Sequence, residues 1–144
     1  VSNEAYEGQM EQIIEALDIG PLLDKPVRKL SLGQRMRCEL AAALIHNPPL
    51  LFLDEPTIGL DVLVKLNIRE FLKEINRKHN TTIMLTTHDI SDIEALCHRV
   101  IILDKGKIIY DGPLSRLRQT VPGGEEATTE EIIRHIYEKG ITHV

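Results

Sequence analysis

Two adjacent carboxylates follow a short apolar run near the middle of the chain. The run is Leu50–Leu53, and Asp54, Glu55 and Pro56 come directly after it. If the run is a strand of an α/β sheet, the carboxylates lie at the edge where such sheets bind ligands. Asp54 would then hold Mg²⁺ directly or through water, and Glu55 would polarise an attacking water. Asp-Glu-Pro is also common turn material, so a strand ending in a polar turn explains this stretch equally well on its own.

Two further groups carry residue types that suit phosphate chemistry. Ser31 and Gln34 have the spacing of a capping box at a helix N-terminus, with the small Gly33 between them. The amides and hydroxyl of such a terminus could also grip a phosphate, although many helices simply begin this way. His88 follows a β-branched run and could contact a phosphate or hold Glu55 and its water. A lone histidine at such a place is more often structural.

The hydrophobic pattern predicts the elements that must position these residues. Apolar residues at helical spacing predict helices over residues 3–18 and 31–46, a third that Asp61 caps, and a short one from Ile90 to Leu96. The runs Leu50–Leu53 and Thr81–Thr87 are predicted as strands buried on both faces. Strands that alternate with helices are typical of an α/β domain with a mainly parallel sheet.

The last third of the chain adds a hairpin and a final helix. Val100–Leu103 and Lys107–Tyr110 flank a turn sequence and predict the hairpin. Pro122-Gly123-Gly124 predicts a linker, after which Thr128 and Glu131 form a capping box for an amphipathic helix.

Taken in order, these groups resemble the motifs of the ATP-binding cassette (ABC) ATPases over roughly residues 5 to 112. Leu30–Gln34 resembles the signature motif, and Leu50–Glu55 resembles Walker B with its catalytic glutamate. Ile58–Asp61 resembles the D-loop, and His88 the switch histidine. In the stretches Asp54–Asp61 and Arg35–Leu40 the chain is similar to the exporter branch that serves drugs, sodium and polyketides.

The resemblance implies a fold and a division of the chain. It implies an α/β, partial P-loop NTPase fold, mainly a parallel sheet with helices on both faces, plus part of the helical signature subdomain. Residues 1–47 would be the signature part, residues 48–112 the Walker B half of the core, and residues 113–144 a linker and amphipathic helix.

The resemblance also implies a function. The parent protein would be the ATPase subunit of an exporter, with ATP and Mg²⁺ as cofactors. Glu55 and His88 would be catalytic and Asp54 would hold the metal. The residues expected to bind the nucleotide are Ser31, Gly33, Gln34 and Asp61, the first three acting on the nucleotide of a partner. Partners would be a second ATPase subunit, paired head to tail, and transmembrane permease subunits that keep the protein on the inner face of the membrane.

Two departures from the family pattern limit what the chain can do alone. Leu32 stands where the signature usually has glycine, and no Gly-x-x-x-x-Gly-Lys-Ser/Thr occurs among the 144 residues. The chain therefore resembles a C-terminal fragment and is expected to be inactive by itself. The strand that leads into the phosphate loop would normally lie between Thr81–Thr87 and Arg99–Leu103. Its absence leaves three outcomes: these two strands pair with each other, another chain fills the gap, or this half of the sheet is poorly ordered. We expect the chain to self-associate, with the interface centred on Thr81–Thr87 and Arg99–Leu103.

Composition excludes several other classes of protein. Net charge is −5 and aromatic residues make up 3% of the chain, so neither a basic footprint nor stacking platforms indicate nucleic acid. No apolar run reaches the ~18 residues of a membrane span, so membrane association is expected through a partner. Two rivals remain open: a soluble ABC ATPase of DNA repair or chromosome type, and a non-catalytic interaction module. Long heptad coiled coils would favour the first, and residues 3–30 show only one short helix.

Overall fold

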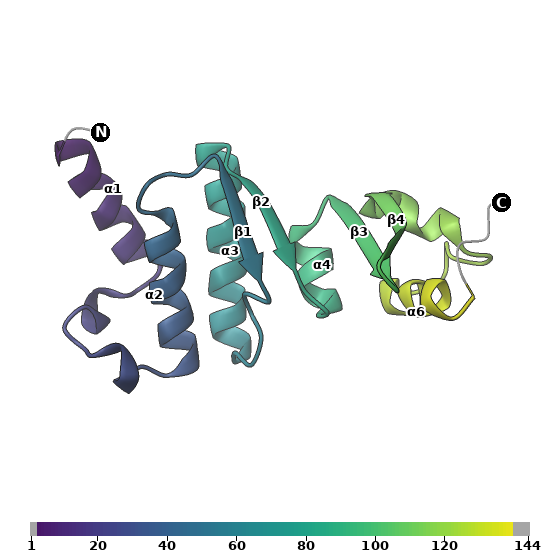
Figure 1. The fold of residues 1–144 in the computed structure, drawn as a ribbon, viewed down its shortest axis with the longest axis horizontal. Helices are drawn as coiled ribbons and strands as arrows, with labels where there is room; N and C mark the ends of the chain where they lie inside the picture. Colours follow the sequence, from purple (N-terminus) through teal and green to yellow (C-terminus); the bar gives the residue numbers. More distant parts are fainter. Residues whose placement is uncertain (1–2, 140–144) are drawn as a thin grey trace. The chain divides into compact units, whose positions relative to one another are not determined.

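The chain forms two compact units in a computed structural model that describes residues 3–139. One unit is Val1–Thr87 and the other is His88–Val144. The first contains α1 (Asn3–Ala16), α2 (Leu32–Leu44), β1 (Leu50–Asp54), α3 (Val62–His79) and β2 (Thr82–Thr86) (Figure 1). The second contains α4 (Ile90–Leu96), β3 (Arg99–Asp104), β4 (Lys107–Pro113), α5 (Leu114–Leu117) and α6 (Thr129–Lys139). This division differs from the motif segments 1–47, 48–112 and 113–144.

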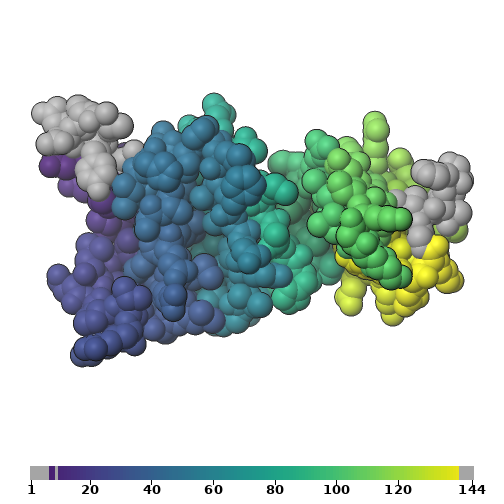
Figure 2. All heavy atoms as spheres, in the orientation of Figure 1, coloured from purple at the N-terminus to yellow at the C-terminus, as the bar shows by residue number. Residues whose placement is uncertain are grey.

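In the first unit, α1 and α2 are joined through short 3₁₀ turns and a half-buried arginine. The guanidinium of Arg37 on α2 donates to the carbonyl oxygens of Leu17 and Asp18 at 3.1 and 3.2 Å, where α1 has just ended. A cation suits this position because the last carbonyls of a helix carry partial negative charge. Atoms of α2, in blue, form part of the visible surface of this unit in Figure 2.

β1 and β2 form a parallel two-stranded sheet beside α3. Leu50 pairs with Thr82 and Asp54 with Thr86 at the two ends of the register. One face of the sheet and the apolar stripe of α3 supply the buried side chains of this core: Leu51, Ile68, Phe71, Leu72 and Ile75. The parallel pairing confirms the predicted α/β class.

The prediction that these two strands are buried on both faces is wrong. Phe52 is 66% exposed and its register partner Met84 is 51% exposed. Leu50 is also exposed on β1. The physical reason is that only two strands pair here and no described helix covers the second face. The apolar run correctly indicated a strand. Whether one or both faces of that strand are covered depends on tertiary packing, which the run does not show.

The second unit is built on the predicted hairpin. β3 and β4 pair antiparallel through a turn in which Lys105 and Gly106 both have positive φ, the backbone that a tight two-residue turn requires. Arg99 and Asp111 form a two-bond ion pair across the strands at 2.7 and 2.8 Å.

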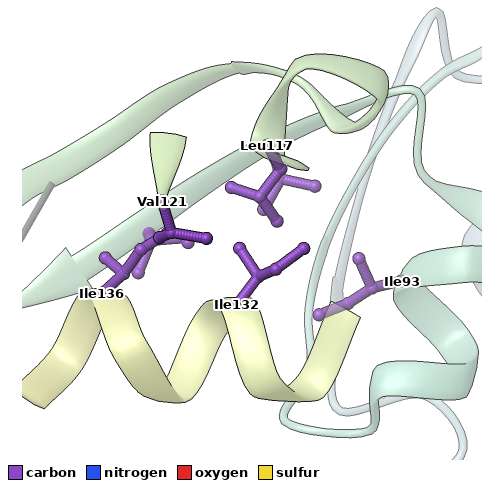
Figure 3. Packing of buried hydrophobic residues seen from close by; sticks show 7 residues of the cluster. Ile93, Leu117, Val121, Ile132 and Ile136 are labelled. Atoms are coloured by element: carbon purple, nitrogen blue, oxygen red, sulfur yellow. The ribbon is translucent and has the colours of Figure 1, made fainter. Parts of the chain in front are cut away.

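α6 and the segment before it fold back to complete the core of the second unit. Figure 3 shows Ile93, Leu117, Val121, Ile132 and Ile136 packed together. The predicted capping box is confirmed, because Glu131 N–H donates to the Thr128 hydroxyl and Thr128 N–H donates to the Glu131 carboxylate. The stretch predicted as a linker is a packed turn in which Gly124 is buried and donates to Val121 O at 3.2 Å.

The two strands that were expected to flank the phosphate-loop strand, β2 and β3, do not pair with each other. β2 pairs with β1 and β3 pairs with β4, in two separate two-stranded sheets. Of the three outcomes expected for an absent central strand, pairing of β2 with β3 is not observed. Both segments form strands, with one register shift in β3 between Ile102 and Leu103.

Candidate functional site

The carboxyl ends of β1 and β2 bring Asp54 and Thr86 together. These two residues are partners in the parallel register, and the Thr86 hydroxyl donates to Asp54 Oδ1. The next amide, Glu55 N–H, donates to Thr86 O at 3.1 Å and to Thr86 Oγ1 at 3.2 Å. Asp54 itself is exposed. The sheet edge thus presents an exposed carboxylate whose direction is fixed by a hydroxyl on the neighbouring strand.

Glu55 departs from strand geometry immediately after Asp54. Its φ is 47°, in the left-handed region that non-glycine residues enter at an energetic cost. Pro56 and Thr57 follow it and are both buried, and Ile58 N–H donates to Glu55 O at 3.1 Å. The surrounding turn therefore holds Glu55 in a conformation it would not adopt alone. Such strain is often found at functional sites.

The N-terminus of α2 forms as the sequence predicted. The Ser31 hydroxyl accepts from Gln34 N–H at 3.3 Å, and Ser31 N–H donates to Gln34 Oε1 at 3.0 Å. The hydroxyl proton of Ser31 is not used in this box, because the oxygen serves as the acceptor. Ser31 is also exposed, so the cap leaves a donor beside the first amides of α2.

The N-terminus of α3 lies against that of α2. A Cβ on Gly33 would stand 3.5 Å from atoms of both Leu60 and Val64, and one on Gly59 would stand 3.0 Å from Leu32. Asp61 caps α3 by accepting from Val64 N–H at 3.0 Å. The structure therefore brings together the predicted binding residues Ser31, Gly33, Gln34 and Asp61 at two adjoining helix starts.

His88 opens the second unit. It is exposed and stands two residues after the end of β2. Asp89 follows it and caps α4, with its carboxylate accepting from Ser91 N–H at 3.0 Å. The predicted catalytic role of His88 remains a prediction.

Sequence reasoning missed two contributors to this site. Thr86 had no predicted role beyond its place in the run Thr81–Thr87, yet it contacts both Asp54 and Glu55. Only the parallel register, which pairs residues 32 positions apart, brings it there. Leu32 was noted as a departure from glycine, and the structure shows that its side chain reaches the Gly59 turn. No signal in the sequence alone could have identified either contact.

The donor set at the sheet edge suits a hard cation that shares its coordination with a ligand. Oxygen donors such as the Asp54 carboxylate are those that Mg²⁺ prefers, and Mg²⁺ is often held by one or two carboxylates together with phosphates and water. Across the part of the chain that the structure describes, no group of three or more His, Cys, Asp or Glu is placed to hold a metal. The side chains at this edge thus suit a metal ion that also binds a phosphate ligand. They do not supply a complete set of metal ligands by themselves.

Comparison with known proteins agrees with this architecture. The family model described as ABC transporter matches residues 1–58. An aliphatic sulfonates import ATP-binding protein of Agrobacterium fabrum is 38% identical over 115 residues, which is 78% of this chain and 44% of that protein. An uncharacterised ABC transporter ATP-binding protein of Bacillus subtilis is 34% identical over 125 residues, 87% of this chain and 38% of that protein. The chain thus spans less than half the length of these relatives.

Solved structures resemble the chain in fold. An ATP-binding subunit of an ABC transporter matches with a TM-score of 0.83 at 24% identity, covering 96% of this chain and 57% of that one. A dimeric ATP-binding cassette bound to ADP and Pi matches with a TM-score of 0.69 at 28% identity, covering 79% and 49%. Within residues 3–139, no helix is both long and apolar enough to cross a membrane. Residues 1–58 thus match the ABC transporter family model, and the chain is similar in sequence and in fold to part of the ATP-binding subunits of ABC transporters.

Proposed function

We propose that the chain supplies the hydrolytic edge and the partner-facing helix starts of an ATPase that drives transport across a membrane. The observation that carries the proposal is the sheet edge where the Thr86 hydroxyl fixes Asp54 and where Glu55 is held in a left-handed backbone. Two adjacent carboxylates at the carboxyl end of a parallel strand suit metal binding by one and proton transfer by the other.

In this proposal each residue has one role at the reacting phosphate. Asp54 holds Mg²⁺, which neutralises charge on the phosphate oxygens when bound. Glu55 accepts a proton from the attacking water, and His88 orients that water and the terminal phosphate. No phosphate-loop motif occurs in the 144 residues. The lysine and the row of backbone amides with which such a loop binds phosphates are therefore missing from this chain. We therefore expect the 144-residue chain to hydrolyse no ATP by itself.

The two helix starts are proposed to act on a nucleotide held by a second subunit. Ser31, Gly33 and Gln34 offer a hydroxyl and helix amides at an exposed N-terminus, which is a ready anion site. Asp61 caps the start of α3, which lies against the start of α2. This arrangement supports a head-to-tail pair of ATPase subunits. Transmembrane permease subunits would then hold the pair on the cytoplasmic face of the membrane.

The direction of transport is the finest part of the proposal. The stretches Asp54–Asp61 and Arg35–Leu40 favour export. Against this, relatives at 37–38% identity carry names for the import of aliphatic sulfonates and molybdenum. Import is therefore the second candidate, and a transport assay in vesicles with the cognate permease would distinguish the two directions.

The experiment that tests the hydrolytic role uses an ATP-hydrolysing protein that contains this chain. Glu55→Gln keeps the shape of the side chain and removes the base, so turnover should fall by about 100-fold or more while ATP binding persists. Glu70→Gln is the matched control, because Glu70 is an exposed carboxylate on α3 that pairs only with Lys73 in the contacts described. If Glu55→Gln leaves the rate within about threefold, a barrier change of only ~0.6 kcal/mol, the role given to Glu55 is wrong.

A further inference from the structure

The last helix, α6, packs against the short helix that follows His88. Ile93 on α4 shares a buried cluster with Ile132 and Ile136 on α6 (Figure 3). At the start of α6 the Thr129 hydroxyl donates to Glu94 Oε1 at 2.6 Å. Thr129 is only 6% exposed whereas Glu94 is exposed, so this hydrogen bond is partly buried and lies beside the apolar contact.

α4 depends on such contacts for its direction. It has seven residues, which is too few for a helix to be stable without tertiary packing. Its N-terminus is capped by Asp89, and His88 comes directly before that cap. The backbone of His88 is therefore separated from α4 by a single residue and must follow any change in the direction of the helix.

We propose that α6 positions the segment that carries His88, and that Thr129 and Glu94 are the positioning residues. Thr129 lies 35 residues beyond Glu94 in the chain, so this hydrogen bond links α4 to a segment that is distant in sequence. The placement of α4 is inferred from its apolar and hydrogen-bonded contacts with α6. The expected effect on turnover rests on the proposed function, because only that function gives His88 a role.

A cavity lies beside this hydrogen bond. The cavity has a volume of about 520 Å³, and its lining includes Glu94, Cys97, Arg118 and Thr129. The hydrogen bond thus lies at the edge of a hollow, whereas the apolar contact of α4 with α6 runs through Ile93. Burial, together with the carboxylate of Asp92, raises the pKa of the Cys97 thiol, and a raised pKa slows its alkylation. Separation of α6 from α4 would expose this thiol and speed its reaction.

The test compares three variants of the 144-residue chain, each with Cys38→Ser so that Cys97 is the single thiol. Thr129→Val removes the hydroxyl and keeps the shape, and Thr129→Ser keeps the hydroxyl. Tyr137→Phe is the matched control, because the Tyr137 hydroxyl ties the same helix to Leu103 O at 3.3 Å rather than to α4. The readouts are amide hydrogen exchange of α4 and β3 and the rate of Cys97 alkylation by iodoacetamide.

We expect Thr129→Val to raise α4 exchange and Cys97 alkylation by about tenfold while β3 exchange stays within about twofold. Thr129→Ser should restore both rates, and Tyr137→Phe should leave α4 exchange unchanged. Unchanged α4 exchange in Thr129→Val would overturn the proposal. So would an equal rise in β3, which would indicate loss of the whole unit, or a failure of Thr129→Ser to restore the rates.

A second arm separates this proposal from the proposed function. In an ATP-hydrolysing protein that contains this chain, Thr129→Val should lower kcat several-fold and leave KM unchanged, and Thr129→Ser should restore kcat. If His88→Ala has no effect on turnover, the catalytic role of His88 fails, while the exchange data still decide whether α6 positions α4. If His88→Ala abolishes turnover and Thr129→Val leaves kcat unchanged, the positioning claim is wrong.

Discussion

Replacement of Gly124 by alanine should destabilise the second unit strongly. The residue lies in the turn between α5 and α6, where a Cβ would stand 2.0 Å from the carbonyl oxygen of Arg118 and 2.9 Å from a methyl group of Val121. The first of these neighbours is backbone and cannot rotate away. The turn itself must therefore open to accept the added methyl group.

The magnitude follows from these distances. Moving the Arg118 oxygen from 2.0 Å to an ordinary contact requires a backbone shift of roughly 1 Å or more. Overpacking of this kind typically costs about 1–3 kcal/mol. The same shift would disturb the bond from the Arg118 guanidinium to Ala127 O, worth about 1 kcal/mol. We therefore expect Gly124→Ala to lower the free energy of unfolding of this unit by about 3 kcal/mol.

Gly123→Ala is the matched control in the same turn. Gly123 has a φ of 72° with nothing within 4 Å of its Cβ position, so alanine there meets only the left-handed backbone cost of about 1 kcal/mol. Hydrogen exchange of the Ile132 and Ile136 amides reports the free energy of opening in each variant, and amides of α3 serve as the internal reference. The reasoning is refuted if Gly124→Ala costs no more than Gly123→Ala.

Two further predictions concern charge and surface. The two hydrogen bonds from Arg99 lower the pKa of Asp111 below its ordinary value of 3.8, so their stabilisation is complete above that value and lost as pH falls through the lower folded pKa. Acidification below about pH 4 should therefore loosen the β3–β4 hairpin, and Asp111→Asn should remove this pH dependence of the hairpin amide signals. On the open face of β1 and β2, Phe52→Lys should weaken the self-association expected of the isolated chain at tens of micromolar, because Phe52 and Met84 are the most exposed apolar side chains there. Sedimentation that finds the unsubstituted chain monomeric at these concentrations would contradict the expectation.

Local chemistry made several elements predictable from the sequence. The capping boxes at Ser31 and Thr128 involve residues three positions apart, so their hydrogen bonds depend little on the remainder of the fold. The same holds for the Asp61 cap and for the hairpin turn at Lys105-Gly106. Each of these features satisfies backbone groups within one turn of chain, and the structure confirms them.

The candidate site was only partly predictable for the opposite reason. The order of the motifs identified Asp54 and Glu55, but the hydroxyl that fixes Asp54 comes from Thr86 on another strand. Gly33 and Leu32 were noted for their size, and their contacts with Leu60 and Gly59 depend on how two helices pack. Contacts between segments distant in sequence leave no periodic signal in either segment.

Sequence alone determined which residues end strands, cap helices and carry the acid, hydroxyl and imidazole groups, because those properties belong to single turns of chain. Tertiary structure decided that Phe52 faces solvent, that Gly124 is packed in a turn rather than a linker, and that Thr129 ties α6 to α4. Burial depends on how many layers cover a face, and a tie between distant helices depends on where both are placed. These quantities are set by the whole fold.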